Sequence, residues 1–197
     1  MRKEYQSIIN EYKNQINGCP KGLTCIDKFD VDDRNGVWAL FAKEKNTNNK
    51  QWICLQVGKS KGILTEIKGD LFRIFAAEEA KLVDVRFINQ FGEEIPGDFV
   101  KKYPKDVDQI YKFISEQYKD FVFMEVASNV SDEDRTEIER CFAWIVKARF
   151  WRNGGSFSCP REMMDQSEEL LEQMSNIDVK RIIKKFIEEN KGEIYRL

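Results

Sequence analysis

Three groups of side chains in this 197-residue sequence could take part in phosphate chemistry, and the first is a glycine turn with a lysine, Gly58-Lys59-Ser60. The turn follows an apolar, β-rich run and precedes a helical pattern. Backbone N–H groups at such a helix N-terminus can hold a phosphate or sulfate. The turn is not a P-loop, because that motif requires a glycine where Ile53 stands. The structural alternative is an ordinary strand-to-helix turn with a solvated lysine.

The second group centres on a carboxylate, Glu139, in a helical pattern that begins after Ser131. Ser131 is a suitable N-cap, and the acids after it suit the positive end of a helix. Glu139 lies one turn before Phe142, at the border of the apolar stripe. A carboxylate there is a candidate metal ligand. The alternative is a structural ion pair with Arg135, which is four residues earlier on the same helix face.

The third group mixes cations with aromatic rings near the expected end of that helix. Its members are Lys147, Arg149, Phe150, Trp151, Arg152 and Asn153. Cations bind nucleic-acid phosphates and aromatic rings stack on bases, so Lys147, Arg149, Trp151 and Arg152 are candidate nucleic-acid contacts. The alternative is that the rings anchor the helix end to the core while the cations lie in solvent.

The composition restricts the chemistry of these groups. The chain has no histidine, which excludes Ser-His-Asp triads, Cys-His proteases, HExxH zinc sites and other His-ligated metals. A metal would be held by carboxylates and other oxygens, which favours Mg²⁺ or a similar hard ion. The net charge of -2 excludes a uniformly basic coat protein but allows a local basic groove.

The five cysteines show no zinc-site spacing, and their number is odd. A reducing, cytoplasmic compartment is therefore expected. No apolar run approaches the length of a membrane span and no signal peptide is recognisable, so no membrane partner is expected.

Hydrophobic periodicity predicts the elements that must position these groups. Helices are expected at 2–17, from Ile63 to Phe75, at 106–119, from 131 to about 150, at 161–174 and at 178–190. Strands are expected at 36–42, 51–57, 82–88 and 120–127, the first two forming a β-hairpin, and 19–35 is expected to be a loop. The predicted fold class is α+β: a small mixed or antiparallel sheet that starts with a β-hairpin and is flanked by helices. We expect one domain over 1–197, with a core at 36–155 and helical extensions at 1–35 and 156–197.

The order of these pieces resembles the GIY-YIG nucleases. In that family the hairpin strands read Gly-Ile-Tyr and Tyr-Ile-Gly, and the corresponding segments here are Gly36-Val37-Trp38 and Gln56-Val57-Gly58. A helix with an arginine follows in the family. Later come a strand, a helix with a metal-binding glutamate, and an asparagine beyond it, which correspond here to Glu139 and Asn153. The match covers 36–155 and is one of order and spacing more than of letters.

The sequence departs from the family pattern at three positions. Trp38 and Gln56 replace the two tyrosines, and an indole or an amide cannot lose a proton as a phenol can. Glu66 stands where the family often has its arginine, and Arg73 on the same helix is the substitute we would name. Strand 82–88 and helix 106–119 would be an insertion.

The resemblance implies a divalent-metal-dependent DNA endonuclease, with restriction-type cleavage as one form of it. Glu139 would hold Mg²⁺ or Mn²⁺, and Lys59 and Arg73 would contact the phosphate. Asn153 would position the site or a water. Trp38 and Gln56 would occupy the positions of the catalytic tyrosines. The alternative is a catalytically degenerate module that binds nucleic acid or a protein partner. A third reading is an unrelated α+β fold that shares these letters by chance.

Overall fold

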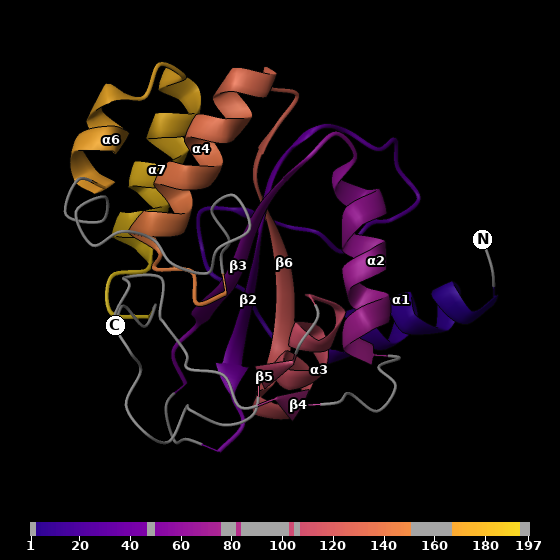
Figure 1. The fold of residues 1–197 in the computed structure, drawn as a ribbon. Coiled ribbons are helices and arrows are strands. Elements are labelled where there is room, and N and C mark those ends of the chain that lie inside the picture. Colours follow the sequence, from indigo (N-terminus) through magenta and orange to yellow (C-terminus); the bar gives the residue numbers. More distant parts are fainter. Residues whose placement is uncertain are drawn as a thin grey trace.

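A four-stranded antiparallel sheet, in the order β1-β6-β2-β3, lies between two groups of helices (Figure 1). The computed structural model describes residues 3–46, 50–75, 82–83, 103–104, 107–150 and 167–193. The sheet contains β1 (Thr24–Cys25), β2 (Gly36–Glu44), β3 (Ile53–Ser60) and β6 (Tyr118–Ser128). The helices are α1 (Lys3–Gln15), α2 (Ile63–Phe75), α3 (Val107–Gln117), α4 (Asp132–Ile145), α6 (Ser167–Gln173) and α7 (Ile177–Glu189). The predicted α+β class is confirmed, and of the two sheet types left open the structure has the antiparallel one.

β2 is a central strand, paired with β3 on one side and with β6 on the other. β2 and β3 form the predicted hairpin, but β3 extends farther than predicted because Ser60 pairs with Gly36. Lys59 therefore projects from a paired strand and not from a free turn. β1, which the sequence pattern placed inside a loop, adds a two-residue edge to β6.

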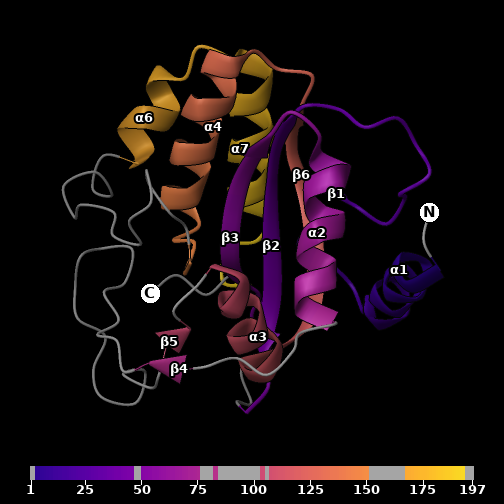
Figure 2. The same cartoon turned by 45° about the vertical axis from the view of Figure 1, so that its right-hand side comes forward.

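The two faces of the sheet carry separate hydrophobic cores because side chains alternate along each strand. Val37, Ala39 and Phe41 of β2 face α4 and α7, together with Phe142 and Phe186. Trp38, Leu40 and Ala42 face α1, α2 and α3. Figure 2 shows the two helix groups on opposite sides of the strands. Each side chain of the sheet therefore faces either the α4 and α7 side or the α1, α2 and α3 side.

A bulge in β3 changes the alternation in the middle of the hairpin. Leu40 pairs with Gln56 and the next residue, Phe41, pairs with Cys54, so Leu55 has no partner of its own across the ladder. Leu55 packs in the core on the α2 side, whereas Cys54 and Val57 pack in the core on the α4 side.

Helix α4 ends at Ile145, about five residues earlier than the sequence pattern predicted. Lys147 has a left-handed φ of 52°, and the N–H of Ala148 donates to the carbonyl of Ala143, which closes the helix. The chain then pairs with β3, because the N–H groups of Arg149 and Phe150 donate to the carbonyls of Cys54 and Leu55. Residues predicted to continue the helix instead extend the hydrogen bonding of the hairpin.

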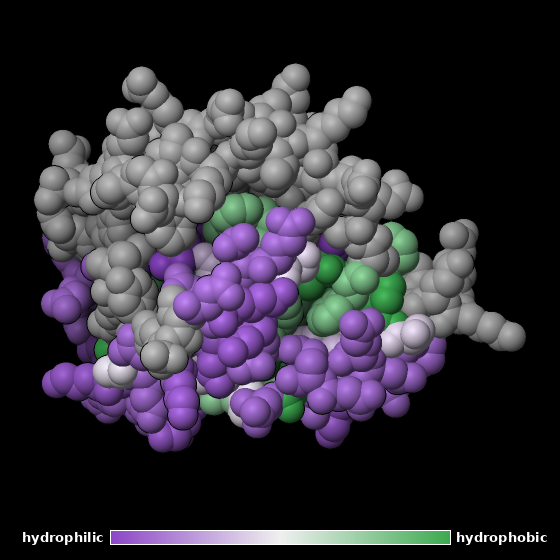
Figure 3. All heavy atoms as spheres, turned by 90° about the horizontal axis from the view of Figure 1, so that it is seen from below, coloured by the Kyte–Doolittle hydropathy of each residue, from purple (hydrophilic) through white to green (hydrophobic). Residues whose placement is uncertain are grey.

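Parts of the remaining predictions lie outside the described residues. Of the predicted strand 82–88, the structure describes Leu82–Val83 as β4, which pairs with β5 (Tyr103–Pro104). Of the predicted helix 161–174, the described part is α6. In the view from below, hydrophilic side chains dominate the described surface (Figure 3). Over the described ranges, no helix combines the length and the apolar character needed to cross a membrane.

Candidate functional site

The end of β3 meets α4 through one lysine. Lys59 Nζ donates to Thr136 Oγ1 at 2.9 Å and lies 3.4 Å from Glu139 Oε2. The Lys59 side chain is 41% exposed and the Glu139 side chain 16% exposed, so this ion pair lies at the surface but is partly shielded. Glu139 thus faces the hairpin, as the predicted site requires.

Arg135 fixes α4 against the hairpin at this point. Its guanidinium donates to the Ser60 carbonyl at 2.8 Å and to the Asp132 carboxylate, and its side chain is only 6% exposed. Ser131 caps the helix as predicted, because its hydroxyl accepts from the Asp134 N–H at 3.0 Å. The suggested Arg135–Glu139 ion pair is therefore replaced by two separate contacts, Arg135 to the end of β3 and Glu139 to Lys59.

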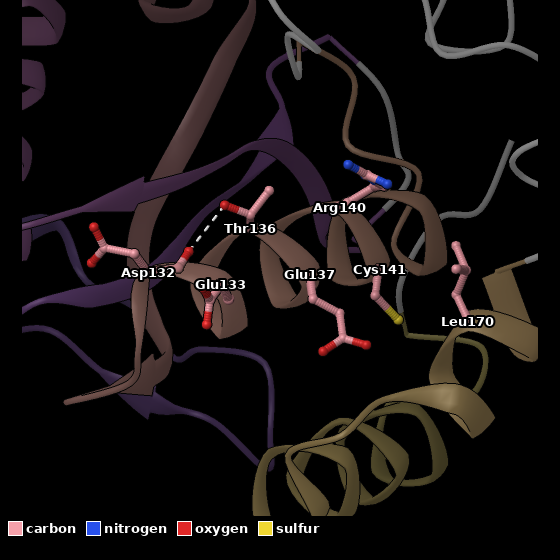
Figure 4. A pocket seen from close by; sticks show the side chains of 7 residues that line it. All are labelled: Asp132, Glu133, Thr136, Glu137, Arg140, Cys141 and Leu170. Carbon is pink, nitrogen blue, oxygen red and sulfur yellow. Dashed lines mark hydrogen bonds between the residues drawn. The ribbon is translucent and has the colours of Figure 1, made fainter.

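A hollow of about 550 Å³ borders this contact on the outer side of α4 (Figure 4). Its lining consists of Asp132, Glu133, Thr136, Glu137, Arg140, Cys141 and Leu170. In Figure 4, Glu137 and Cys141 point toward α6 and α7, and the Thr136 hydroxyl donates to the Asp132 carbonyl. Three carboxylates against one arginine make the hollow negative, so a polyanion would approach Lys59 from the hairpin side.

Trp38 lies on the opposite face of the sheet from Lys59 and contacts Gly58 and Glu66. It pairs across the strands with Gly58, and a Cβ at residue 58 would lie 2.5 Å from Trp38 Cζ2. The Trp38 indole N–H donates to Glu66 Oε2 at 3.2 Å. A buried tryptophan paired with a half-buried carboxylate therefore fills the place where the resemblance puts a tyrosine and an arginine.

Gln56 and Arg73 also lie on the α2 side. Gln56 is 8% exposed, and the Tyr111 hydroxyl of α3 lies beside its amide. Arg73 NH1 donates to Asp70 Oδ1 at 2.9 Å, and its guanidinium is 5.7 Å from the centre of the Tyr111 ring. Both residues take part in the contact between α2, α3 and β3.

The predicted convergence on one phosphate-binding site is therefore only partly observed. Lys59 and Glu139 meet on the α4 side, whereas Trp38, Gln56 and Arg73 lie on the α2 side. The expectation that Arg73 and Lys59 act on the same phosphate is wrong because the sheet separates them. Asn153 lies outside the described residues, as do Trp151 and Arg152.

Arg149 differs from its predicted role as a nucleic-acid contact. Its side chain is 8% exposed and donates to Glu44 Oε1 at 2.8 Å and to the Tyr118 hydroxyl. A guanidinium enclosed in this way holds the segment after α4 to β2 and β6 and is not available to phosphate. Lys147, which has a left-handed backbone conformation just after α4, is half-buried.

Glu139 could supply one ligand to a magnesium ion. Mg²⁺ usually keeps several waters and takes one or two carboxylates plus substrate phosphate oxygens. Glu139 supplies one such carboxylate, and in the parts of the chain that the structure describes there is no group of three acidic or cysteine side chains able to enclose a metal. Lys59 lies against Oε2 of the same carboxylate, so a cation bound there would compete with the ammonium group for its charge.

Several residues around the Lys59–Glu139 contact and around Gln56 and Arg73 were not among the predicted site residues. Thr136 and Arg135 could have been found, since they lie one turn from Glu139 on the same helix. The opposite orientation of Gln56 and Lys59 could also have been found, because residues three apart in a strand point to opposite faces. Tyr111 carried no signal in the sequence, since its contact with Gln56 depends on how α3 returns to the sheet.

Comparisons with known proteins add no family to these observations. No protein-family model, curated protein or solved structure matches the chain.

Proposed function

We propose that this chain is a divalent-metal-dependent DNA endonuclease of GIY-YIG type. The observation that supports the proposal is the contact between Lys59 and Glu139, 3.4 Å apart, at the junction of the hairpin and α4. A carboxylate beside a half-exposed ammonium group offers one ligand for a cation and one charge for a phosphate. Mg²⁺ or Mn²⁺ is the cofactor that the hard oxygen donors favour.

The roles of the residues follow from the needs of phosphodiester hydrolysis. A bound divalent ion would polarise a phosphate oxygen and stabilise the leaving group. Glu139 would hold that ion, and Lys59, freed from its carboxylate, would face the negative charge that develops on the phosphate. Thr136 already binds the Lys59 ammonium at 2.9 Å and would keep it oriented during the exchange. Arg135 would position α4 through its bond to Ser60.

The test is cleavage of plasmid and genomic DNA of varied sequence with Mg²⁺ or Mn²⁺. We expect Glu139→Ala and Lys59→Ala to lower the cleavage rate at least about 100-fold, the usual effect of removing a positioned charge from such a site. Glu137→Ala is the matched control, because Glu137 lies on the same helix but points into the negative hollow (Figure 4). Cleavage that survives Glu139→Ala would remove this residue from the proposal.

A second candidate function, a nuclease-like module without catalytic turnover, is favoured by a different observation. Glu66 accepts a hydrogen bond from Trp38 where the resemblance calls for a tyrosine and an arginine, and Arg73 is held by buried Asp70. Salt-dependent DNA binding without cleavage, measured by fluorescence anisotropy, would support a nucleic-acid-binding module. If no DNA binds even at low salt, a protein partner becomes the better assignment.

A further inference from the structure

A buried carboxyl group lies at the junction of α2, α3 and β3, on the opposite side of the sheet from Glu139. Asp70 is 2% exposed, and its Oδ1 accepts a hydrogen bond from Arg73 at 2.9 Å. The Tyr111 hydroxyl lies beside both the Asp70 carboxyl and the Gln56 amide. These four residues, here named the Asp70 cluster, join two helices to the hairpin.

The Asp70 cluster contains two buried acceptors that its donors do not reach. Asp70 Oδ2 and Gln56 Oε1 are both buried and have no hydrogen-bond partner. A buried acceptor without a partner destabilises the fold, because it has lost its hydrogen bonds to water without a replacement. One proton on Oδ2 would turn an unpaired acceptor into a donor and remove one negative charge from the interior. The unpaired Oδ2 therefore favours a protonated Asp70, against the ion pair that Oδ1 makes with Arg73.

The charges that face Asp70 come from a few groups. On α2 they are Arg73, which opposes proton binding, and Glu66, which favours it. From α3 comes the Tyr111 hydroxyl, and from β3 the neutral Gln56 amide. Burial is the largest influence on the carboxyl and, together with Glu66, it raises the pKa of Asp70 to about 6 against the opposing effect of Tyr111 and Arg73.

We propose that Asp70 is a proton-binding site that couples mild acidity to the docking of α3 on α2. A neutral Asp70 closes the contact, and ionisation places an incompletely satisfied negative charge inside it. An unfolded aspartate ionises near pH 4. Between that value and about pH 6 the folded chain keeps a proton that the unfolded chain has lost. The stabilisation by this proton is complete in acid and is lost as pH rises through the folded pKa.

The experiment has two measurements on the intact chain. Carbon-13 NMR of the aspartate carboxyl groups should show one of them, assigned to Asp70 by its loss in Asp70→Asn, titrating near pH 6. Hydrogen exchange of Val107–Gln117, corrected for the intrinsic pH dependence, should show the opening equilibrium of α3 rising with pH. A pKa that rises from near 4 to about 6 allows a change of about 100-fold over the whole range, of which about tenfold falls between pH 5 and 7.5.

Two variants separate Asp70 from other acids. Asp70→Asn keeps the shape of the neutral carboxyl, so the exchange of α3 should become independent of pH between 5 and 7.5. Glu66→Gln, one turn earlier on α2, should keep the transition with a lower midpoint. An Asp70 titration below about pH 4.5, or wild-type α3 exchange that does not change over this range, overturns the proposal. The carboxyl titration uses the native chain, and through-bond correlation to the backbone assigns the signal to Asp70 even if Asp70→Asn fails to fold.

Discussion

At the scale of single residues, the Trp38 ring explains why residue 58 is a glycine. Gly58 pairs with Trp38 across the hairpin, and the indole covers the space that a side chain would take. A feature that resembles a phosphate-binding turn therefore also has a packing function. The adjacent Lys59 points to the other face and remains the candidate for phosphate contact.

Gly58→Ala should destabilise the fold by about 1–3 kcal/mol, because its Cβ would lie 2.5 Å from the Trp38 ring and force the core to shift. Urea unfolding followed by tryptophan fluorescence measures the change. Gly69→Ala is the matched control on α2, since a Cβ there meets no atom within 4 Å. That substitution should stabilise the chain by up to about 1 kcal/mol through helix propensity. Equal effects of the two variants would contradict this packing role.

Arg149→Ala should cost about 3 kcal/mol, because it leaves the partly buried Glu44 carboxylate without its cation. Thermal unfolding of wild type and variant gives the difference. Arg181→Ala is the control, since the ion pair of Arg181 with Asp178 is 76% and 86% exposed and should contribute almost nothing. If Arg149→Ala instead leaves stability intact and weakens DNA binding alone, the predicted nucleic-acid role would be restored.

At the scale of elements, helix α2 begins at a cap supplied from far along the chain. Asp33 accepts hydrogen bonds from the Leu64 and Thr65 N–H groups at 2.8 and 3.1 Å and from the Thr65 hydroxyl at 2.6 Å. The Ile63 N–H also donates to the Arg34 carbonyl. The start of α2 therefore depends on the 19–35 segment, which the sequence pattern described only as a loop.

Asp33→Ala should lower stability by about 1 kcal/mol at neutral pH, the usual loss for an N-cap. Partial burial acts to raise the pKa of Asp33, but the hydrogen bonds from Thr65 and Leu64 outweigh it and hold the pKa below its ordinary value. The contribution of Asp33 is thus present above the unfolded pKa and is lost as pH falls through the folded one. Urea unfolding at pH 7 and pH 3 should show wild type and Asp33→Ala converging in acid. Asp33→Asn, which keeps an acceptor without charge, should lie between them at pH 7, and a constant difference at both pH values would argue against this cap.

At the scale of the whole molecule, a buried hydroxyl of the N-terminal helix forms hydrogen bonds with β6 and with the residue that follows β1. Tyr12 donates to the Ile26 carbonyl at 3.0 Å and accepts from the Phe123 N–H at 2.9 Å. Burial, as the largest influence, raises the pKa of Tyr12 above its ordinary value, so the phenol stays neutral. The predicted N-terminal extension is therefore part of the α2-side core and not a separate appendage.

Tyr12→Phe should lower the stability of the entire chain by about 1–3 kcal/mol, since it leaves a buried N–H and a buried carbonyl without a partner. The loss should appear in both fluorescence and circular dichroism as one shifted transition, because α1 shares a core with the sheet. Gln6→Ala on the exposed face of α1 should change stability by less than about 0.5 kcal/mol. A separate early transition for α1 in Tyr12→Phe would show that this helix is not integrated into the core.

The sequence by itself determined the hairpin and the α4 segment with its Ser131 cap. These features follow from local periodicity and from capping chemistry, which act within a few residues of one another. Strand alternation places Gln56 and Lys59 on opposite faces of the sheet, and only the tertiary structure decided that α2 and α3 cover one face while Lys59 meets Glu139 of α4 on the other. That division depends on which helices cover which face of the sheet. It arises from contacts between residues far apart in the chain, which the spacing of letters does not encode.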